Sequence, residues 1–329
     1  MTRAIRFHKT GGPDVLQIDE VETPKPAKGE VLIRMRALGL NRAEVMFREG
    51  QYVITPQFPA QLGYEGAGEI EAVGPGVTGF AVGDAVSVVP AFGFDEYGLY
   101  GEKVLAPARA VVKHPKSLSW VDAAAIWMQY VTAYGALIDI GNIQPDSVVL
   151  IAAASSSVGL AAIQVAKSRG AIPIALTRKS DKKAALLSAG ATAVIATDEE
   201  DLVAEVARLT NGRGAQFIFD PVGGPTLAKL IDAAAEYGTI VLYGALSPED
   251  GPVSALKMLG KHLTIRGYQL FEITTDDARL AKAKAFISEG IATGAFKPVV
   301  ARTFPFEQIV EAHRYLESNA QVGKVVVTL

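Results

Sequence analysis

The spacing of apolar and polar residues divides the chain near residue 120. Before that point, short stretches in which apolar and polar residues alternate, such as 30–37 and 68–73, are separated by turns rich in Gly and Pro. Alternation with a period of two predicts half-buried β-strands. A further short strand is predicted at 85–89, after the turn-forming segment 79–84. We therefore expect the first 122 residues to form a compact β-rich domain.

From about residue 123 to residue 265, continuous apolar stretches alternate with helical segments. Helices are predicted at 158–169 and 182–188, each closed by a glycine, which commonly ends a helix. Buried strands that alternate with helices predict a parallel sheet covered on both faces. Pro173 counts against one of these strands unless it lies at the strand's start. The predicted strands are 147–151, 172–176, 193–195, 217–219 and 239–243.

The last segment carries predicted helices at 277–289 and 306–318 and an apolar strand at 324–329. Because a terminal apolar strand must pair with another strand, we expect this segment to return to the first domain. The predicted fold class is α/β. Residues 1–122 and 266–329 would form the β-rich domain, and residues 123–265 a doubly wound parallel sheet of the Rossmann type.

Composition narrows the kinds of site that are possible. The formal net charge of −3 lacks the basic excess that is typical of proteins that bind nucleic acid or membrane surfaces. The absence of cysteine excludes disulfides, thiolate zinc sites and cysteine nucleophiles, and the four histidines are far apart in sequence. We find neither an apolar run long enough to span a bilayer nor a signal peptide, so a cytoplasmic location is expected.

A serine-rich turn joins the first strand of the parallel region to its helix. Ala154, Ser156 and Gly159 stand at the three glycine positions of the Gly-x-Gly-x-x-Gly turn that binds dinucleotides. That turn brings the backbone close to the pyrophosphate and directs helix N-terminal amides at it. A serine-rich helix cap without a ligand is the alternative. The predicted pyrophosphate contacts are Ser155, Ser156, Ser157 and Val158.

The end of the second strand bears on the choice of cofactor. Sites for NAD usually carry an acidic residue here, which binds the ribose hydroxyls. In this chain Arg178 and Lys179 come first, and Asp181 lies between cations. Arg178 suits a 2′-phosphate, and Lys179 or Lys183 would add positive charge; a solvated basic helix start is the alternative. We predict NADPH as the cofactor, with Thr177, Arg178 and Lys183 among its contacts.

Short motifs form an ordered series along essentially the whole chain. Two of them are Gly39-Leu40-Asn41-Arg42-Ala43-Glu44 and Leu62-Gly63-Tyr64-Glu65-Gly66-Ala67-Gly68. The others are residues 48–52, 73–77 with Phe80, 83–86, 132–134 and 323–326. Together they resemble the zinc-free quinone oxidoreductase family of the medium-chain dehydrogenases and reductases. Zinc-dependent relatives carry a cysteine and a histidine where this chain has Asn41, or its neighbours, and Tyr64. The resemblance therefore implies a site without metal.

The resemblance also implies a GroES-like catalytic domain, a Rossmann domain, NADPH bound between them, and a homodimer. It implies that Asn41 and Tyr52 line the nicotinamide or acceptor end of the site and that Lys324 lies near the phosphates or closes the cleft. The alternatives are a turn residue for Asn41, a core-edge residue for Tyr52 and a solvated strand residue for Lys324. The expected nicotinamide contacts are Thr132, Gly244, Ala245, Leu246, Tyr268, Gln269 and Leu270. The expected acceptor pocket comprises Tyr64, Phe92, Trp127 and Phe271.

The predicted reaction is transfer of a hydride, or of electrons, from NADPH to a small-molecule quinone. Asn41 or Tyr52 would donate a hydrogen bond to the acceptor oxygen as negative charge develops on it. The serine run lacks a Gly-x-Ser-x-Gly elbow, which argues against a hydrolase. Two alternatives remain: reduction of the polarised double bond of an enone, enoyl or alkenal acceptor, and a non-catalytic NADPH-binding protein.

Overall fold

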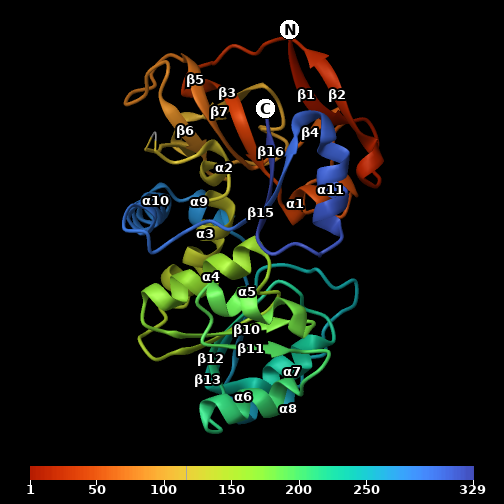
Figure 1. Cartoon of the computed structure of the whole chain (residues 1–329), viewed down its shortest axis with the longest axis vertical. Helices are drawn as coiled ribbons and strands as arrows, with labels where there is room; N and C mark the ends of the chain where they lie inside the picture. Colours follow the sequence, from red (N-terminus) through yellow and green to blue (C-terminus); the bar gives the residue numbers. More distant parts are fainter. Residues whose placement is uncertain (116) are drawn as a thin grey trace. The chain divides into compact units, whose positions relative to one another are not determined.

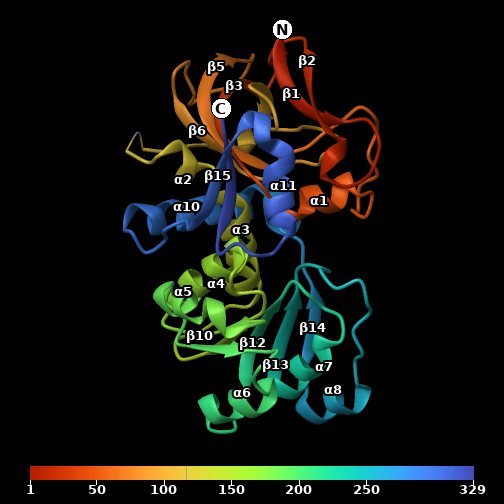
Figure 2. The same ribbon diagram turned by 45° about the vertical axis from the view of Figure 1, so that its right-hand side comes forward.

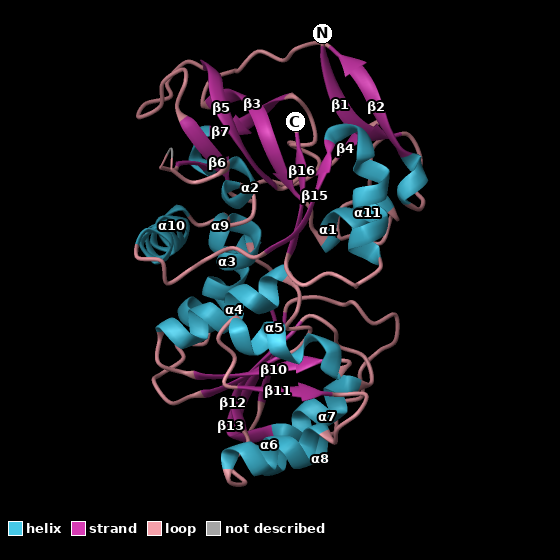
Figure 3. Ribbon diagram, in the orientation of Figure 1, coloured by secondary structure: helices cyan, strands magenta, loops and turns pink. Residues whose placement is uncertain are grey.

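The computed structural model describes residues 1–115 and 117–329, which form two compact units. Unit 1 consists of Met1–Met128 and Pro298–Leu329, and unit 2 of Gln129–Lys297. Only the last 32 residues therefore rejoin the first unit. The expectation that residues 266–297 belong there differs from the observed division, as does the expected boundary at residue 122. Figure 3 shows a strand-rich unit 1 and, in unit 2, strands that alternate with helices.

Side-chain packing inside unit 2 explains where residues 266–297 belong. Helix α10 (Asp277–Ala292) places the Phe286 ring 5.2 Å from the Tyr134 ring and 5.4 Å from the Phe296 ring. Arg279 of the same helix forms an ion pair with Asp139, 140 residues earlier in the chain. These partners are remote in sequence, so periodicity alone could not assign the helix to its unit.

Unit 1 is built around β3 (Glu30–Gly39), which pairs antiparallel with β5 (Glu65–Val73), β7 (Lys103–Pro107) and the terminal strand β16 (Lys324–Thr328). The larger sheet has the order β15-β16-β3-β5-β6-β8, with β7 paired to β3, and a second sheet has the order β2-β1-β4. The strands predicted at 30–37, 68–73, 85–89 and 324–329 are thus confirmed. The other strands and the α-helices of unit 1 are β1 (Thr2–Phe7), β2 (Leu16–Val21), α1 (Arg42–Arg48), β4 (Ala60–Gln61), β6 (Ala85–Val88), β8 (Val111–Lys113), α2 (Trp120–Ala123), β15 (Val300–Pro305) and α11 (Ile309–Glu317).

Unit 2 holds a six-stranded parallel sheet of order β11-β10-β9-β12-β13-β14. This is the doubly wound order in which the chain runs outward from β9 in both directions, so the switch point lies between β9 and β12. The predicted parallel sheet is confirmed. Its strands are β9 (Val148–Ile151), β10 (Ile172–Thr177), β11 (Ala193–Ala196), β12 (Ala215–Asp220), β13 (Ala234–Leu242) and β14 (Thr264–Gly267).

Helices cover both faces of this sheet. In Figures 1 and 2, α4 lies on one side of the strands and α6, α7 and α8 lie on the other. The predicted helices 158–169 and 182–188 are confirmed as α4 and α5, and Pro173 is the second residue of β10, at the strand's start. The helices of this part are α3 (Trp127–Tyr134), α4 (Ser157–Ser168), α5 (Lys183–Ser188), α6 (Leu202–Thr210), α7 (Thr226–Ala233), α8 (Ala255–Lys261), α9 (Phe271–Thr274) and α10.

The unit 2 core lies where the sheet meets α6 and α7. Leu150 and Ile218 of the central strands are fully buried in one cluster with Leu230 of α7 and Val206 of α6. Central strands with such continuous apolar runs are typical of sheets that are covered on both faces. Within the described ranges, 1–115 and 117–329, no helix is long and apolar enough to cross a membrane.

Candidate functional site

The serine-rich turn connects β9 to α4 at the switch point of the unit 2 sheet. Ser156 caps α4, and its hydroxyl oxygen accepts a hydrogen bond from the Gly159 N–H at 3.0 Å. A Cβ on Gly159 would lie 2.5 Å from Cα of Ala154, so only glycine permits this close packing of helix and strand end. The turn therefore has the backbone geometry that the third glycine of a dinucleotide-binding turn provides.

Two cations flank this turn. The Lys182 ammonium lies 3.5 Å from the Ser155 hydroxyl, and both burial and the nearby Arg178 guanidinium lower the pKa of Lys182. Lys183, which we predicted from the sequence, instead forms an ion pair with Glu200 at 2.7 Å. Lys182 is therefore the lysine beside the turn, and the sequence did not single it out.

The groups around the turn fit an anionic ligand. The backbone N–H groups of Ser157 and Val158 belong to the first turn of α4, where a helix has no earlier carbonyl to accept them. The positive end of the helix dipole adds to the charge of Arg178 and Lys182. Amide and hydroxyl donors combined with two cations match the chemistry of a pyrophosphate with a further phosphate nearby.

The other predicted cofactor contacts of unit 2 occupy varied environments. Gly244–Leu246 follow β13 and are exposed, and the Leu246 N–H donates to the Pro221 carbonyl at 3.0 Å. Tyr268 is buried, with its hydroxyl 3.4 Å from the Val131 carbonyl, so its side chain packs inside the unit. Thr177, at the end of β10, and Thr132, in α3, are also buried. Gln269 is exposed, whereas Leu270 and Phe271 are partly buried.

In unit 1, Asn41 caps the start of α1. Its side-chain amide donates to the Gly39 carbonyl at 3.1 Å and to Glu44 Oε1 at 3.2 Å, and its Oδ1 accepts from the Lys324 ammonium at 2.6 Å. An asparagine amide has two hydrogens to donate. Because both are engaged here, Asn41 is placed to hold the turn rather than to donate a hydrogen bond to an acceptor molecule.

Lys324 is almost fully buried in unit 1, with 1% of its surface exposed. Its ammonium forms an ion pair with Glu65, whose other oxygen accepts the Met128 N–H at 3.0 Å. A Cβ on Gly39 would lie 2.9 Å from both the Lys324 and Glu65 side chains, so this glycine makes room for the pair. This burial rules out the alternative of a solvated strand residue. That Lys324 lies near the phosphates or closes the cleft stays a prediction.

Glu44 is the centre of this region and was missed from the sequence. Its carboxylate accepts hydrogen bonds from the Asn41 N–H at 2.6 Å and the Tyr100 hydroxyl at 2.8 Å. It also accepts from the Tyr64 N–H at 3.1 Å. Burial raises its pKa to about 7, although Lys324 and the hydrogen bonds act to lower it. The sequence does hold one signal for Glu44: it follows Asn41 by three residues, which is the spacing of a helix capping box.

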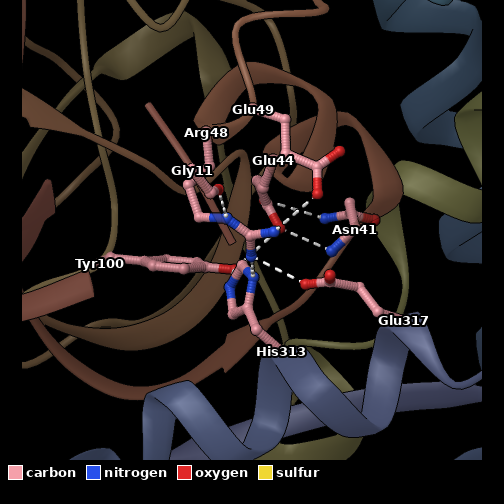
Figure 4. A network of polar contacts seen from close by, with 8 residues as sticks. All are labelled: Gly11, Asn41, Glu44, Arg48, Glu49, Tyr100, His313 and Glu317. Carbon is pink, nitrogen blue, oxygen red and sulfur yellow. Dashed lines mark hydrogen bonds and ion pairs between the residues drawn. The ribbon is translucent and has the colours of Figure 1, made fainter. Parts of the chain in front are cut away.

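The hydrogen bonds around Glu44 continue to helix α11. We call the connected set the buried polar network, and Figure 4 shows the part of it around Glu44 and Arg48. Arg48, fully buried, contacts His313 Nδ1 at 2.9 Å and Glu317 at 2.8 Å. The network comprises Asn41, Glu44, Arg48, Glu65, Tyr100, His313, Glu317 and Lys324.

Tyr52 belongs to an aromatic cluster in unit 1. The Tyr64 hydroxyl donates to the Tyr52 hydroxyl at 3.4 Å, which leaves the Tyr52 hydrogen for another acceptor. Tyr64 stacks on Phe94 with ring centroids 3.8 Å apart and lies 6.2 Å from Phe92. Of the predicted pocket residues, Tyr64 lies beside Tyr52, and Phe92 lies beside Tyr64. Phe94, which the sequence did not indicate, also contacts Tyr52. Trp127, at the start of α3, is buried.

A separate cavity of about 510 Å³ in unit 1 holds none of the predicted site residues. Arg6, Glu30, Tyr97 and Lys103 are among the residues that line it. In the part of the chain that the structure describes, no three His, Asp or Glu side chains are grouped so that they could hold a metal ion.

Comparison with known proteins supports the two-domain division. Residues 27–116 match the alcohol dehydrogenase GroES-like domain, and residues 157–288 match the zinc-binding dehydrogenase domain. Quinone oxidoreductase 1 of Escherichia coli (strain K12) is 33% identical over 98% of both chains. The chain belongs to the quinone oxidoreductase family of the medium-chain dehydrogenase/reductase superfamily.

Other members of this superfamily carry different names. The human synaptic vesicle membrane protein VAT-1 homolog is 30% identical over 96% of this chain and 84% of its own. A 2-haloacrylate reductase of Burkholderia sp is 28% identical over 99% of both chains. Among solved structures, E. coli quinone oxidoreductase complexed with NADPH superposes with a TM-score of 0.91 at 31% identity, covering 99% of this chain and 100% of that one. The chain is therefore an oxidoreductase with a GroES-like and a Rossmann domain.

Proposed function

We propose that this protein reduces quinones with NADPH and that it does so without zinc. The observation that carries the proposal is the β9–α4 turn with Arg178 and Lys182 beside it. Its donors suit a dinucleotide with an additional phosphate, and the family relative solved with NADPH supports the same cofactor. The absence of cysteine supports the zinc-free part of the proposal, because zinc-dependent relatives use a cysteine ligand.

Bound NADPH would supply the hydride, and the chain would bind and orient the reactants. Ser155–Val158 would hold the pyrophosphate, and Arg178 with Lys182 the 2′-phosphate. Gly244–Leu246 and Gln269, which are exposed at the ends of β13 and β14, are the proposed nicotinamide contacts of unit 2, together with Thr132.

Tyr52 is the proposed hydrogen-bond donor to the acceptor. Because Tyr64 donates to Tyr52, the Tyr52 hydrogen can be directed to an acceptor oxygen on which negative charge develops. Desolvation raises the pKa of Tyr52, so the hydroxyl keeps its proton at neutral pH. Tyr64 would orient the Tyr52 hydroxyl through its hydrogen bond, and Asn41 would act indirectly, by holding its turn.

A comparison of acceptors tests this proposal. NADPH oxidation is measured with a 1,4-benzoquinone, an α,β-unsaturated ketone and an enoyl thioester, with and without a zinc chelator. We expect the highest kcat/KM with the quinone and no effect of the chelator. Activity that requires added zinc would contradict the zinc-free mechanism, and NADPH binding without turnover of any acceptor would favour a non-catalytic role.

The second candidate is reduction of a polarised carbon–carbon double bond. The likeness to a 2-haloacrylate reductase, over nearly the whole of both chains, favours it. The same cofactor site and the same donor would serve, because negative charge again develops on an oxygen conjugated to the reacting carbon. A higher kcat/KM with the unsaturated ketone than with the quinone would favour this candidate.

We also propose that the protein is a homodimer and that it works in the cytoplasm. β14 is one of the two edge strands of the unit 2 sheet, and an edge strand can pair with a second copy. On the neighbouring helix α8, Leu256 and Leu259 are 80% and 72% exposed. Sedimentation velocity of the wild-type protein and of Leu259→Glu tests this: the wild type should sediment as a dimer and the variant should dissociate more readily.

A further inference from the structure

The buried polar network contains a chain of hydrogen bonds whose direction is determined. Arg48 has only donors, so the His313 Nδ1 atom, 2.9 Å from the Arg48 guanidinium, must accept. Burial and the Arg48 charge lower the pKa of His313 to about 3, so the ring is neutral and carries its hydrogen on Nε2. That nitrogen lies 3.4 Å from the Tyr100 hydroxyl and donates to it.

The same direction continues to Glu44. With the Tyr100 oxygen accepting from His313, the Tyr100 hydrogen points to Glu44 Oε2, 2.8 Å away. Three N–H groups, two from Asn41 and one from Tyr64, also donate to this carboxylate. Figure 4 shows the path from Arg48 through His313 and Tyr100 to Glu44 and Asn41.

Protonation of Glu44 would conflict with this arrangement. A protonated carboxyl at Oε2 would have to donate to the Tyr100 oxygen, and Tyr100 would then have to turn its hydrogen toward His313 Nε2. His313 would then need its hydrogen on Nδ1, where the Arg48 N–H already points. Two donors would face each other in a buried site, which is costly. The chain of donors therefore favours the carboxylate form of Glu44.

We propose that Tyr100 and His313 are positioning residues for the reducing site: by donating along one direction they hold Glu44 as a carboxylate, and Glu44 holds the Asn41 turn and Lys324 in place. This inference rests on the proposed function, because it takes the Asn41 turn to form part of the acceptor end of the site. His313 thereby gives helix α11 a role in positioning Glu44, although no residue of this helix lies in a recognised motif.

The arrangement predicts how activity depends on pH. Glu44 is buried and its pKa is raised to about 7, so it titrates near neutral pH. Hydrogen bonds that stabilise the carboxylate therefore determine how much of it is ionised at that pH. Below that pH, protonation would disturb the Asn41 turn, and kcat/KM should fall. Four titratable groups interact with Glu44: Lys324 from β16, Tyr100 from the segment before β7, Tyr64 from the segment before β5 and Tyr52 from the loop after α1. Tyr100 in turn faces Arg48 from α1, Glu65 from β5 and His313 from α11.

Two matched pairs of proteins test the proposal. Tyr100→Phe removes the donor to Glu44, in comparison with wild type. His313→Gln keeps an N–H close to the Nε2 position, whereas His313→Asn keeps an acceptor close to Nδ1 but does not reach Tyr100. The readouts are the pH profile of kcat/KM with NADPH and a benzoquinone, from about pH 5.5 to pH 9, the NADPH dissociation constant, and the unfolding midpoint at each pH.

A variant that loses one hydrogen bond to the Glu44 carboxylate should have a higher Glu44 pKa. Its kcat/KM should therefore begin to fall, on the acid side of the profile, at a pH about one to two units higher than in the wild type. We expect this shift in Tyr100→Phe and His313→Asn, whereas the acid side of the profile of His313→Gln should stay close to that of the wild type. The NADPH dissociation constant should be unchanged in all three variants. A loss of activity by the same factor at every pH, or equal limbs in the two His313 variants, would overturn the proposal.

The test separates this inference from the proposed function. If the wild-type protein binds no NADPH or reduces no acceptor, the proposed function fails, and the unfolding midpoints still report on Glu44. The wild type and Tyr100→Phe should then have similar midpoints near pH 5 and should diverge above pH 7, as the unsupported carboxylate forms. Midpoints that differ by a constant amount across the pH range would contradict the role of Tyr100.

Discussion

The β9–α4 turn of unit 2 and the buried polar network of unit 1 use polar residues in opposite ways. The turn keeps its donors near the surface and close together in sequence: Ser155 and Lys182 are 27 residues apart. The network buries charges that come from distant parts of the chain, with Asn41 and Lys324 separated by 283 residues. Donors and cations gathered near the surface at a helix N-terminus suit the binding of an anion, whereas buried polar groups that pair with one another hold the fold together.

The largest expected effect comes from breaking the buried ion pair of the network. Lys324→Met leaves the Glu65 carboxylate buried without its cation, which should cost about 3–5 kcal/mol of unfolding free energy. Chemical denaturation measures this. The double variant Lys324→Met/Glu65→Met removes both charges and should recover part of the loss. Equal stability of the single variant and the wild type would show that the pair is not buried as described.

The second expected effect concerns how folding stability depends on pH, to which Glu44 and His313 contribute in opposite directions. Glu44 has a folded pKa of about 7, above its ordinary 4.5, so its contribution to stability is present below pH 4.5 and is lost as the pH rises to about 7. His313 has a folded pKa of about 3, below its ordinary 6.5, so its contribution is present above pH 6.5 and is lost as the pH falls to about 3. The two contributions oppose each other between these ordinary values.

Variants separate the two contributions. The stability difference between wild type and Glu44→Gln should decrease by about 3 kcal/mol from pH 4.5 to above pH 7. The difference between wild type and His313→Gln should increase from pH 3 to pH 6.5. Denaturation curves at each pH give both differences. If either difference stays flat, the corresponding group titrates at its ordinary pKa and the network is solvated.

A smaller effect is expected at the turn. Arg178→Ala and Lys182→Ala should each weaken NADPH binding by about tenfold to a hundredfold and leave NADH binding nearly unchanged, because each loses about 1.5–3 kcal/mol of interaction with the 2′-phosphate. Lys183→Ala is the matched control, since Lys183 is paired with Glu200. Fluorescence titration provides the dissociation constants. A larger loss in Lys183→Ala than in Lys182→Ala would reverse our assignment of the two lysines.

The smallest effect is expected at Tyr52. Tyr52→Phe removes one hydrogen bond to the acceptor, worth about 0.5–1.5 kcal/mol, so kcat should fall only several-fold while NADPH affinity stays the same. Tyr64→Phe is the comparison, since it removes the donor to Tyr52 and should have a lesser effect. Complete loss of activity in Tyr52→Phe, with the cofactor still bound, would show that Tyr52 is an essential acid.

The same contrast explains what could be predicted from the sequence. The parallel sheet, the β3, β5 and β6 strands and the serine-rich turn follow from local periodicity and a short motif, and all were found where expected. Lys182 and Lys183 could not be told apart, because the difference lies in the position of Glu200 after the next strand. His313 and Tyr100 lie in no recognised motif, and the motif at 48–52 does not show what Arg48 binds, because the partners of all three lie on other elements.

The proposed function requires that the β9–α4 turn, with Arg178 and Lys182, binds a phosphorylated dinucleotide. Calorimetric titration of the wild-type protein with NADPH and, separately, with NADH tests this directly. We predict saturable binding of NADPH that is at least about tenfold tighter than that of NADH. Equal affinity for the two, or no heat of binding with NADPH, would contradict it.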